Sequence, residues 1–390
     1  MRFGATAAAA VGGAARWRVG AGRPGSRLAR AGRLTHVRSF RLVPAFVVVG
    51  SLLLAACTGG GSDEVAVPDA AVSDAAFIDQ NGEGCASGEL LCVGLVLAPG
   101  ELATSLGTEA LADAADDLAH TEVVETSDMA EYRLALESLE DQSFDLIFAR
   151  PGPDVDGAIR AVNAVANGSG SWFVLVGESN TAEMANVAGL VFNERRVAFL
   201  AGAAAGLLTN TGVVAAVLPT DLDKTTVRYK EGWERGVRFT NPEASFLTNY
   251  HPGALDVSFD DALWSVDATR RAIEGGADVV FGAGGLTGNA ALVEAARQNG
   301  EVYCIGVEAD RWEQITESRP CVVTSALLLV DEAMAQIISD FEAGEAPVGE
   351  IEGDVALAPF RDDEMSDDIA GQLDEILAGI EAGVIIISED

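Results

Sequence analysis

The sequence predicts an α/β protein of two lobes, each built on a parallel sheet with helices on both faces. Short β-branched or apolar runs alternate with amphipathic stretches along most of the chain, and this alternation is typical of parallel sheets. The runs are too numerous for one sheet, and 390 residues suffice for about two or three domains. Because ligands of open α/β sheets bind beyond the carboxyl ends of strands, we expect a cleft between the lobes.

Each strand of the first lobe is predicted from a short apolar run, because a strand buried on both faces has no polar side. Each helix is predicted from apolar residues that recur at helical spacing between two such runs. In chain order we expect a strand at 93–99, a helix at 106–119, a strand at 121–126, a helix at 129–140, a strand at 145–150, a helix at 153–166, and strands at 171–177 and 187–192.

A second series with the same alternation predicts the second lobe. It comprises a helix at 194–208, a strand at 211–218, a helix at 225–238, a strand at 244–250, a helix at 259–274, a strand at 277–284, a helix at 287–298, strands at 303–308 and 321–326, and a helix at 327–343. We place the N-terminal lobe at 90–205 plus part of 326–390, and the C-terminal lobe at 206–325.

Residues 1–56 have the features of an export signal in the usual order. They hold nine arginines and no acidic residue, and the apolar run at 42–56 is shorter than a membrane span. Small residues precede Cys57 and TGGGS follows it, which resembles the lipobox of bacterial lipoproteins; an ordinary buried cysteine is the alternative. The resemblance implies a signal peptide at 1–56, lipidation of Cys57, a flexible tether at 57–89, and extracytoplasmic anchoring to the cell membrane.

The remaining cysteines are Cys85, Cys92, Cys304 and Cys321. An even number in an exported protein favours disulfides. We predict one bridge between Cys85 and Cys92 and another between Cys304 and Cys321, which lie in neighbouring strand-like runs. The spacings match no zinc motif, so we expect no metal site.

The charge of the chain excludes some classes of function. Sixty acidic against 25 basic residues give a net charge of -35, which argues against nucleic acid as a partner. The acids are scattered over helix-like surfaces, where a solvated acidic face is the simpler interpretation than a cation site. The sequence contains no nucleophile elbow, no zinc-protease motif and no phosphate loop. We therefore expect a protein that is not an enzyme and needs no cofactor.

A glycine-rich turn, GAGGLTG at 282–288, follows a predicted strand and precedes a predicted helix. A dinucleotide fingerprint has this placement, but Thr287 stands where the third glycine belongs. We favour the alternative that the glycines let the backbone approach a ligand closely at the end of a strand.

Several separate segments resemble the basic membrane protein family of bacterial substrate-binding lipoproteins. They are NVAGLVFNERRVAFLAGAAAGLLTNTGVVAAV at 186–217, KEGWERGVRFTNPEASF at 230–246, GADVVFGAGGLTGNAALVEAARQNG at 276–300, IGVEADRW at 305–312 and VVTSALLLVDEAM at 322–334. The resemblance covers about 93–349. It implies a type I periplasmic-binding fold with a hinged cleft and delivery of a solute to an ABC importer; the better-known members bind purine nucleosides.

The resemblance implies a ligand site that is altered in part. The family's first-strand loop, close to DxSFN, corresponds to ATSLG at 103–107, which keeps Ser105 but lacks the acid, the stacking Phe and the Asn. Glu308 stands where the family has an Asp that holds ribose hydroxyls. Leu328 stands where the family's SxxK motif has its lysine.

Other positions match the family's site. Phe259 corresponds to the aromatic residue in the loop after a second-lobe strand, and Gly284, Gly285 and Thr287 correspond to the glycine-rich turn. We therefore expect Ser105, Phe259, Gly284, Gly285, Thr287 and Glu308 to bind a small, polar, nucleoside-like ligand, with an ABC permease as the second partner and a monomeric binding protein. A ligand-sensing lipoprotein of the same fold, which signals to a partner, is the alternative.

Overall fold

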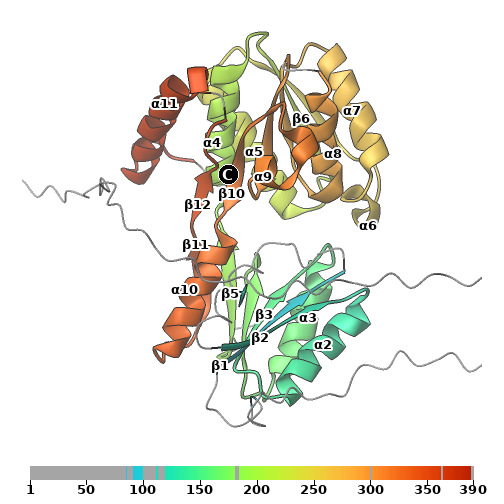
Figure 1. Cartoon of the computed structure of the whole chain (residues 1–390), viewed down its shortest axis with the longest axis vertical. Coiled ribbons are helices and arrows are strands. Elements are labelled where there is room, and N and C mark those ends of the chain that lie inside the picture. The colour runs from blue at the N-terminus through green and yellow to red at the C-terminus, as the bar shows by residue number, and fades with distance from the viewer. Residues whose placement is uncertain are drawn as a thin grey trace, which may run out of the picture. The chain divides into compact units, whose positions relative to one another are not determined.

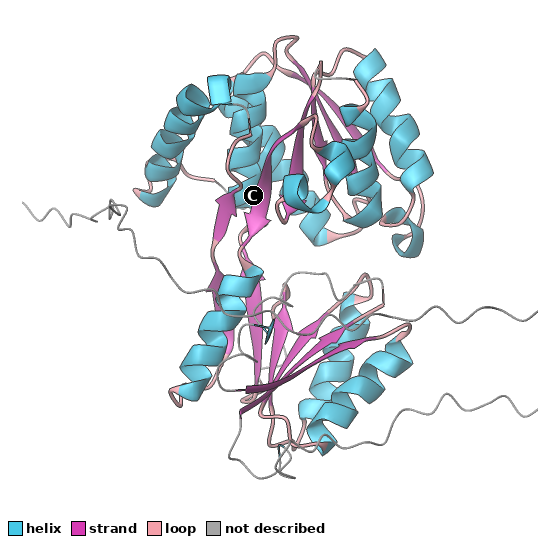
Figure 2. Cartoon of the chain, viewed as in Figure 1, coloured by secondary structure: helices cyan, strands magenta, loops and turns pink. Residues whose placement is uncertain are grey.

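The computed structural model describes Cys85 and residues 91–99, 111–112, 119–180, 184–298, 301–361 and 363–387. These residues form two six-stranded sheets with helices on both faces of each (Figures 1 and 2). The predicted two-sheet α/β architecture is confirmed. The expected signal peptide, Cys57, the rest of the tether other than Cys85, and Ser105 lie outside the described residues.

The first sheet has the strand order β11-β5-β4-β3-β1-β2, and all its pairs are parallel. Its strands are β1 (Leu91–Leu97), β2 (Ala119–Glu125), β3 (Leu146–Arg150), β4 (Trp172–Val176), β5 (Val187–Phe192) and β11 (Gly349–Gly353). Helices α2 (Met129–Asp141) and α3 (Val155–Ala166) pack on one face, and α10 (Val330–Glu342) packs on the other (Figure 1). Side chains of a strand alternate between faces, so β1 sends Cys92 and Val96 to the first cluster and Val93 and Leu95 to the second.

The second sheet has the order β12-β10-β9-β8-β6-β7, in which β12 is antiparallel to β10 and the other pairs are parallel. Its strands are β6 (Val213–Leu218), β7 (Ser245–Tyr250), β8 (Val279–Gly282), β9 (Tyr303–Glu308), β10 (Val322–Leu328) and β12 (Val355–Leu357). One face carries α4 (Glu194–Leu208), α5 (Lys224–Thr240) and α11 (Asp363–Glu381), and the other carries α7 (Ala262–Glu274) and α8 (Gly285–Ala296). Short helices α6 (Leu255–Ser258), α9 (Arg311–Gln314) and η2 (Thr316–Ser318) lie in its connections.

Helix α4 belongs to the core of the second sheet, although the sequence-based boundary at residue 205 assigns most of it to the first lobe. Its apolar side chains pack with those of α5 in one cluster, around the fully buried Trp233. The two helices can approach closely because Gly202 and Gly236 have no Cβ. A Cβ at either position would overlap the backbone of the facing helix. Helix α4 therefore follows β5 of the first sheet and is the first element of the second α/β unit.

Three connections pass from one sheet to the other: after β5, after β10, and between β11 and β12. Leu328, at the end of β10, and Val355, at the start of β12, pack against apolar clusters of both sheets. Within the described residues, no helix combines the length and apolar character that crossing a membrane requires.

Candidate functional site

Most of the predicted ligand residues lie at one edge of the second sheet. Strands β6 to β10 run parallel, so their carboxyl ends meet at the same edge. Phe259 follows β7, Gly284 and Gly285 follow β8, and Glu308 is the last residue of β9. The structure thereby gathers residues that are separated by up to about fifty positions in sequence. Ser105 belongs to a segment outside the described residues.

The Phe259 loop is tied to the start of α8 by the polar atoms of Thr287. The Thr287 hydroxyl donates to Ser258 O at 2.8 Å and accepts from Asp261 N at 3.0 Å, and Thr287 N donates to Phe259 O at 3.1 Å. Thr287 O accepts from Ser265 Oγ at 2.5 Å. Thr287 is fully buried and its polar atoms are all engaged, so it positions half-buried Phe259 rather than offering a hydroxyl to solvent.

Two glycines allow this loop to lie against the N-terminus of α8. Gly284 has φ 87°, and a Cβ there would overlap the ring of Pro219; Gly285 has φ 57°, and its Cβ would lie 2.9 Å from Phe259 O. Both features disfavour any other residue. The N–H groups of Gly285 and Leu286 in the first turn of α8 have no acceptor among the described residues, so they are available to an oxygen of a ligand.

A histidine and an aspartate fix the other side of the same loop. Gly253 N donates to His251 Nδ1 at 2.9 Å, so Nε2 carries the proton and faces Asp261 Oδ2 at 3.2 Å. The backbone N–H of Trp264 and the His251 ring lower the pKa of Asp261. The His251 ring packs edge-on against Trp264, with 4.8 Å between centroids. The loop that carries Phe259 is therefore held at both ends.

Glu308 sits in a strained turn at the end of β9. Its φ is 69°, in the left-handed region, and Ala309 N donates across it to Val307 O at 2.9 Å, which makes Glu308 the centre of a γ-turn. Backbone strain of this kind at a residue other than glycine costs about 1 to 3 kcal/mol and tends to occur at functional sites. Arg311 Nη2 lies 3.3 Å from Glu308 Oε2, while Oε1 has no partner among the described residues.

Arg311 itself is locked by its surroundings. Its Nε donates to Val307 O at 2.9 Å, its Nη1 donates to Gln314 Oε1 at 2.7 Å, and its backbone N–H donates to the buried Ser325 Oγ at 3.1 Å. Arg311 therefore holds the Glu308 carboxylate in one orientation.

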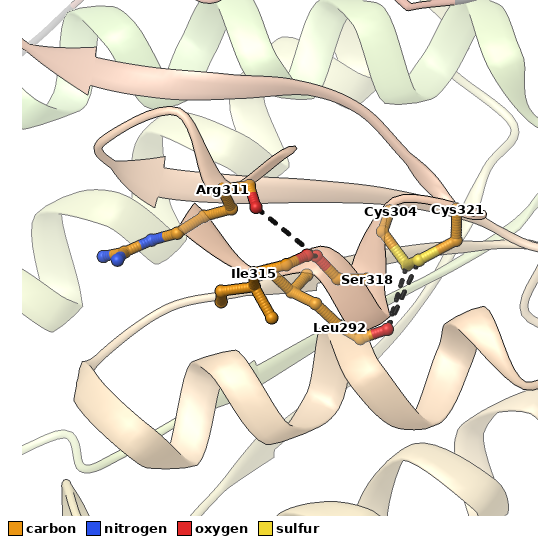
Figure 3. Close-up of a disulfide and its surroundings, with 6 residues drawn as sticks. All are labelled: Leu292, Cys304, Arg311, Ile315, Ser318 and Cys321. Carbon is orange, nitrogen blue, oxygen red and sulfur yellow. Dashed lines mark hydrogen bonds between the residues drawn. A yellow bond between two sulfur atoms is a disulfide. The ribbon is translucent and has the colours of Figure 1, made fainter. Parts of the chain in front are cut away.

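A disulfide between Cys304 and Cys321 closes the loop that contains Arg311. Cys304 and Cys321 are bonded, with 5.0 Å between Cα atoms, at the starts of the paired strands β9 and β10 (Figure 3). Both sulfurs face the carbonyl oxygen of Leu292 on α8, at 3.8 Å from Cys304 Sγ and 3.3 Å from Cys321 Sγ. Ser318 Oγ donates to Ile315 O at 2.9 Å within the loop. Both predicted disulfides are present, since Cys85 and Cys92 are also bonded.

A buried tyrosine, a buried glutamate and a half-buried glutamate lie near the candidate site and were not expected from the sequence. The Tyr229 hydroxyl is buried and has no hydrogen-bond partner among the described residues; burial raises the pKa of Tyr229 far above its ordinary value, as do the charges of Glu308 and Glu194. Burial also raises the pKa of Glu194 to about 7, although Arg228 Nη1 lies 3.5 Å from its Oε2. Burial raises the pKa of Glu178 as well.

The sequence contained only a partial signal for these groups. Arg311 lies within the family-like segment IGVEADRW, but its pairing with Glu308 depends on the turn between them. Tyr229 and Glu194 are ordinary helix residues by pattern. Leu328, where the family has a lysine, is half-buried against apolar side chains. No group of metal-ligating side chains that could hold an ion occurs among the described residues.

Comparison with known proteins gives one family match. The model for the Bmp family, described as ABC transporter substrate-binding protein PnrA-like, matches residues 107–352. The CD4+ T-cell-stimulating antigen of Listeria monocytogenes is 26% identical over 285 residues, which cover 68% of this chain and 76% of that protein.

Solved structures share the fold. An ABC transporter system solute-binding protein from Conexibacter woesei superposes with a TM-score of 0.61 at 21% identity, covering 76% of this chain and 98% of that one. A transcriptional activator of the comK gene from Bacillus halodurans gives 0.62 at 17% identity, covering 74% and 96%. At these identities the likeness concerns the fold alone.

Proposed function

Because the chain belongs to the Bmp family of PnrA-like ABC transporter substrate-binding proteins, we propose that it captures a purine nucleoside or a closely similar ligand for an ABC importer. The proposed site is the carboxyl edge of the second sheet. Phe259 stacks on the base, Glu308 accepts hydrogen bonds from the sugar hydroxyls, and the free N–H groups at the start of α8 donate to a ligand oxygen. The protein binds and releases its ligand without changing it.

The strained backbone of Glu308 carries this proposal. Left-handed backbone at a residue other than glycine costs free energy and occurs preferentially at functional sites. Arg311 orients the Glu308 carboxylate through Oε2, and Oε1 has no partner among the described residues. Two acceptor sites on one carboxylate suit a pair of neighbouring hydroxyls. The buried Tyr229 hydroxyl adds a neutral donor in the field of the same carboxylate.

The N-terminal features support membrane attachment as a further part of the proposal. Arginines, an apolar run, small residues and Cys57 occur in that order in residues 1–57, and a lipidated Cys57 followed by the tether at 57–89 would keep the two lobes close to the importer. Mass spectrometry of the mature N-terminus tests this. Unmodified Cys57 with upstream residues still attached would reject the lipid anchor.

Thermal unfolding of the protein with a panel of solutes tests the ligand class. The panel contains purine nucleosides, pyrimidine nucleosides, free nucleobases, sugars and amino acids. A ligand at about 100 times its dissociation constant adds about 2.7 kcal/mol to the free energy of unfolding, so the midpoint rises clearly. We expect a rise with purine nucleosides. A rise with sugars or amino acids alone would contradict the proposed ligand while leaving the family assignment intact.

A further inference from the structure

A groove between α10 and β11 lies on the first sheet, on elements that do not contribute to the site at the edge of the second sheet. Its volume is about 500 Å³, and all its lining residues come from the stretch 329–354, which α10, the following loop and β11 occupy. Apolar side chains line it in part, among them Ala333, Ile337, Pro347 and Ile351, and Val348 beside them is 59% exposed. Exposed apolar surface with a polar rim is typical of interaction sites.

The rim of this groove carries charge of one sign. Glu332, Asp340, Glu345, Glu352 and Asp354 contribute carboxylates, and the lining contains no basic residue. None of these carboxylates forms an ion pair with a described residue, and Asp340 accepts only from Gln336 Nε2, at 2.6 Å, among side-chain donors. Uncompensated carboxylates around an apolar floor fit a partner with both positive and apolar side chains.

One side of the groove is an unpaired sheet edge. β11 is the outermost strand of its sheet, and among the described strands it pairs only with β5. Such an edge presents backbone N–H and C=O groups to any extended segment that arrives. The short β11 sequence, GEIEG, alternates acidic side chains with its one apolar side chain, Ile351, so an added strand would meet both kinds of contact.

We propose that the α10–β11 groove docks an extended segment of a partner protein, in which Lys or Arg alternates with apolar side chains. The backbone of this segment pairs with the free edge of β11, its apolar side chains contact Val348 and Ile351, and its cations meet the carboxylates of Glu332, Glu345 and Glu352. A second copy of this chain is a poor occupant, because the net charge of -35 makes two copies repel.

A fluorescently labelled peptide of about eight residues, with alternating Lys and Val, tests the proposal by fluorescence anisotropy with the full chain. We expect saturable binding that weakens as salt concentration rises. The double variant Glu332→Lys with Glu345→Lys should weaken binding by about tenfold, because like charges then face each other. The control variant Asp141→Lys with Glu342→Lys makes the same change in net charge at exposed positions outside the groove, and should bind as the parent does.

A peptide with the same side chains but alternate N-methylated amides separates strand pairing from charge attraction. We expect it to bind at least about tenfold more weakly, since it cannot donate along the β11 edge. Equal binding of both peptides, equal binding by the groove and control variants, or no saturable binding to the parent would each overturn the proposal. So would a dimer in analytical ultracentrifugation that the groove variant dissolves, because the occupant would then be a second copy.

Discussion

At the scale of single residues, the backbone of Glu308 links strain to binding. Glu308 and Ser143 are the described residues other than glycine with positive φ, at 69° and 65°. Ser143 lies in the turn after α2, far along the chain from any predicted ligand residue, whereas Glu308 ends β9 at the candidate site. Both residues therefore have a strained backbone, but we assign a role in ligand binding only to Glu308.

Replacing Glu308 by glycine should separate stability from binding. Glycine adopts positive φ without strain, so Glu308→Gly should leave the free energy of unfolding unchanged or raise it by about 1 kcal/mol, and it should abolish the nucleoside-induced rise in the unfolding midpoint. Ser143→Gly is the matched control, with the same expected stability and an unchanged response to ligand. Normal binding by Glu308→Gly would exclude a role for its carboxylate.

Glu194 should make stability fall as pH rises through the weakly acidic range. Its pKa is about 7 in the folded chain against an ordinary value of 4.5, so the folded state favours the protonated form. Its contribution is fully present below the unfolded pKa and is lost between about pH 4.5 and pH 7. Glu194→Gln cannot ionise, so its free energy of unfolding should exceed that of the parent by about 2 to 3 kcal/mol at pH 8.

Chemical denaturation of the parent and Glu194→Gln at pH 4 and pH 8 measures this difference. At pH 4 the two proteins should have equal stability. Glu178, Asp223 and Arg228 act on Glu194 in both proteins, so the comparison isolates one carboxyl group. A variant that is less stable than the parent at pH 8 would show that the contact with Arg228 outweighs the burial of the charge.

At the scale of elements, the sequence predicted buried strands best. YCIGVE and VAGLVF are continuous apolar runs, and the strands begin and end at the expected residues, 303–308 and 187–192. β11 and β12 were not predicted, because β11 reads GEIEG and is an edge strand with exposed side chains, and β12 has three residues. Central strands of a parallel sheet are buried on both faces and therefore read as continuous apolar runs. An exposed edge strand lacks this run and is harder to predict.

For the candidate site, the sequence predicted where the residues lie better than it predicted which groups they contact. Gly284 and Gly285 could be placed at a strand end from their sequence, and both have positive φ. Thr287 was expected among the ligand residues as part of the glycine-rich turn, but the partners of its hydroxyl, Ser258 O and Asp261 N, come from a loop that only the fold brings near. The orientation of the Glu308 carboxylate likewise depends on Arg311, whose backbone N–H donates to Ser325 in another element.

The disulfide between Cys304 and Cys321 should affect binding as well as stability. It closes a loop with a sequence separation of 17, so replacing both cysteines by serine should lower the free energy of unfolding by about 3 kcal/mol. The same change removes the covalent constraint on the segment between residues 304 and 321, which contains Arg311, and should weaken nucleoside binding. Urea denaturation and a ligand titration measure the two effects.

Replacing Cys85 and Cys92 by serine provides the comparison. That bridge, with a separation of 7, ties the start of the first sheet, so its loss should lower stability but leave the affinity for ligand unchanged. Equal affinities for ligand in both double variants would show that the Cys304–Cys321 disulfide does not contribute to nucleoside binding.

At the scale of the whole molecule, three connections join a parallel sheet to a second sheet in which only the β10–β12 pair is antiparallel. The alternation of strands and helices was sufficient to predict two α/β units. It also placed the helix at 194–208 at the start of the second series, although the predicted lobe boundary at residue 205 cuts through this helix. The packing of α4 with α5 assigns α4 to the second unit. The net charge of -35 argues against a nucleic-acid surface, and the groove between α10 and β11 is lined by carboxylates and by no basic side chain.

We propose that this chain binds a purine nucleoside through Phe259 and Glu308. Calorimetric titration of a purine nucleoside into the parent, Phe259→Ala and Phe239→Ala tests it most directly. Phe239 is the matched control, because it is 49% exposed on α5 and packs on Phe199. We predict saturable binding by the parent and Phe239→Ala, and affinity lower by about tenfold or more in Phe259→Ala, since a stacked base contributes about 1 to 3 kcal/mol. Equal affinity of all three proteins, or no binding by the parent, would contradict the account.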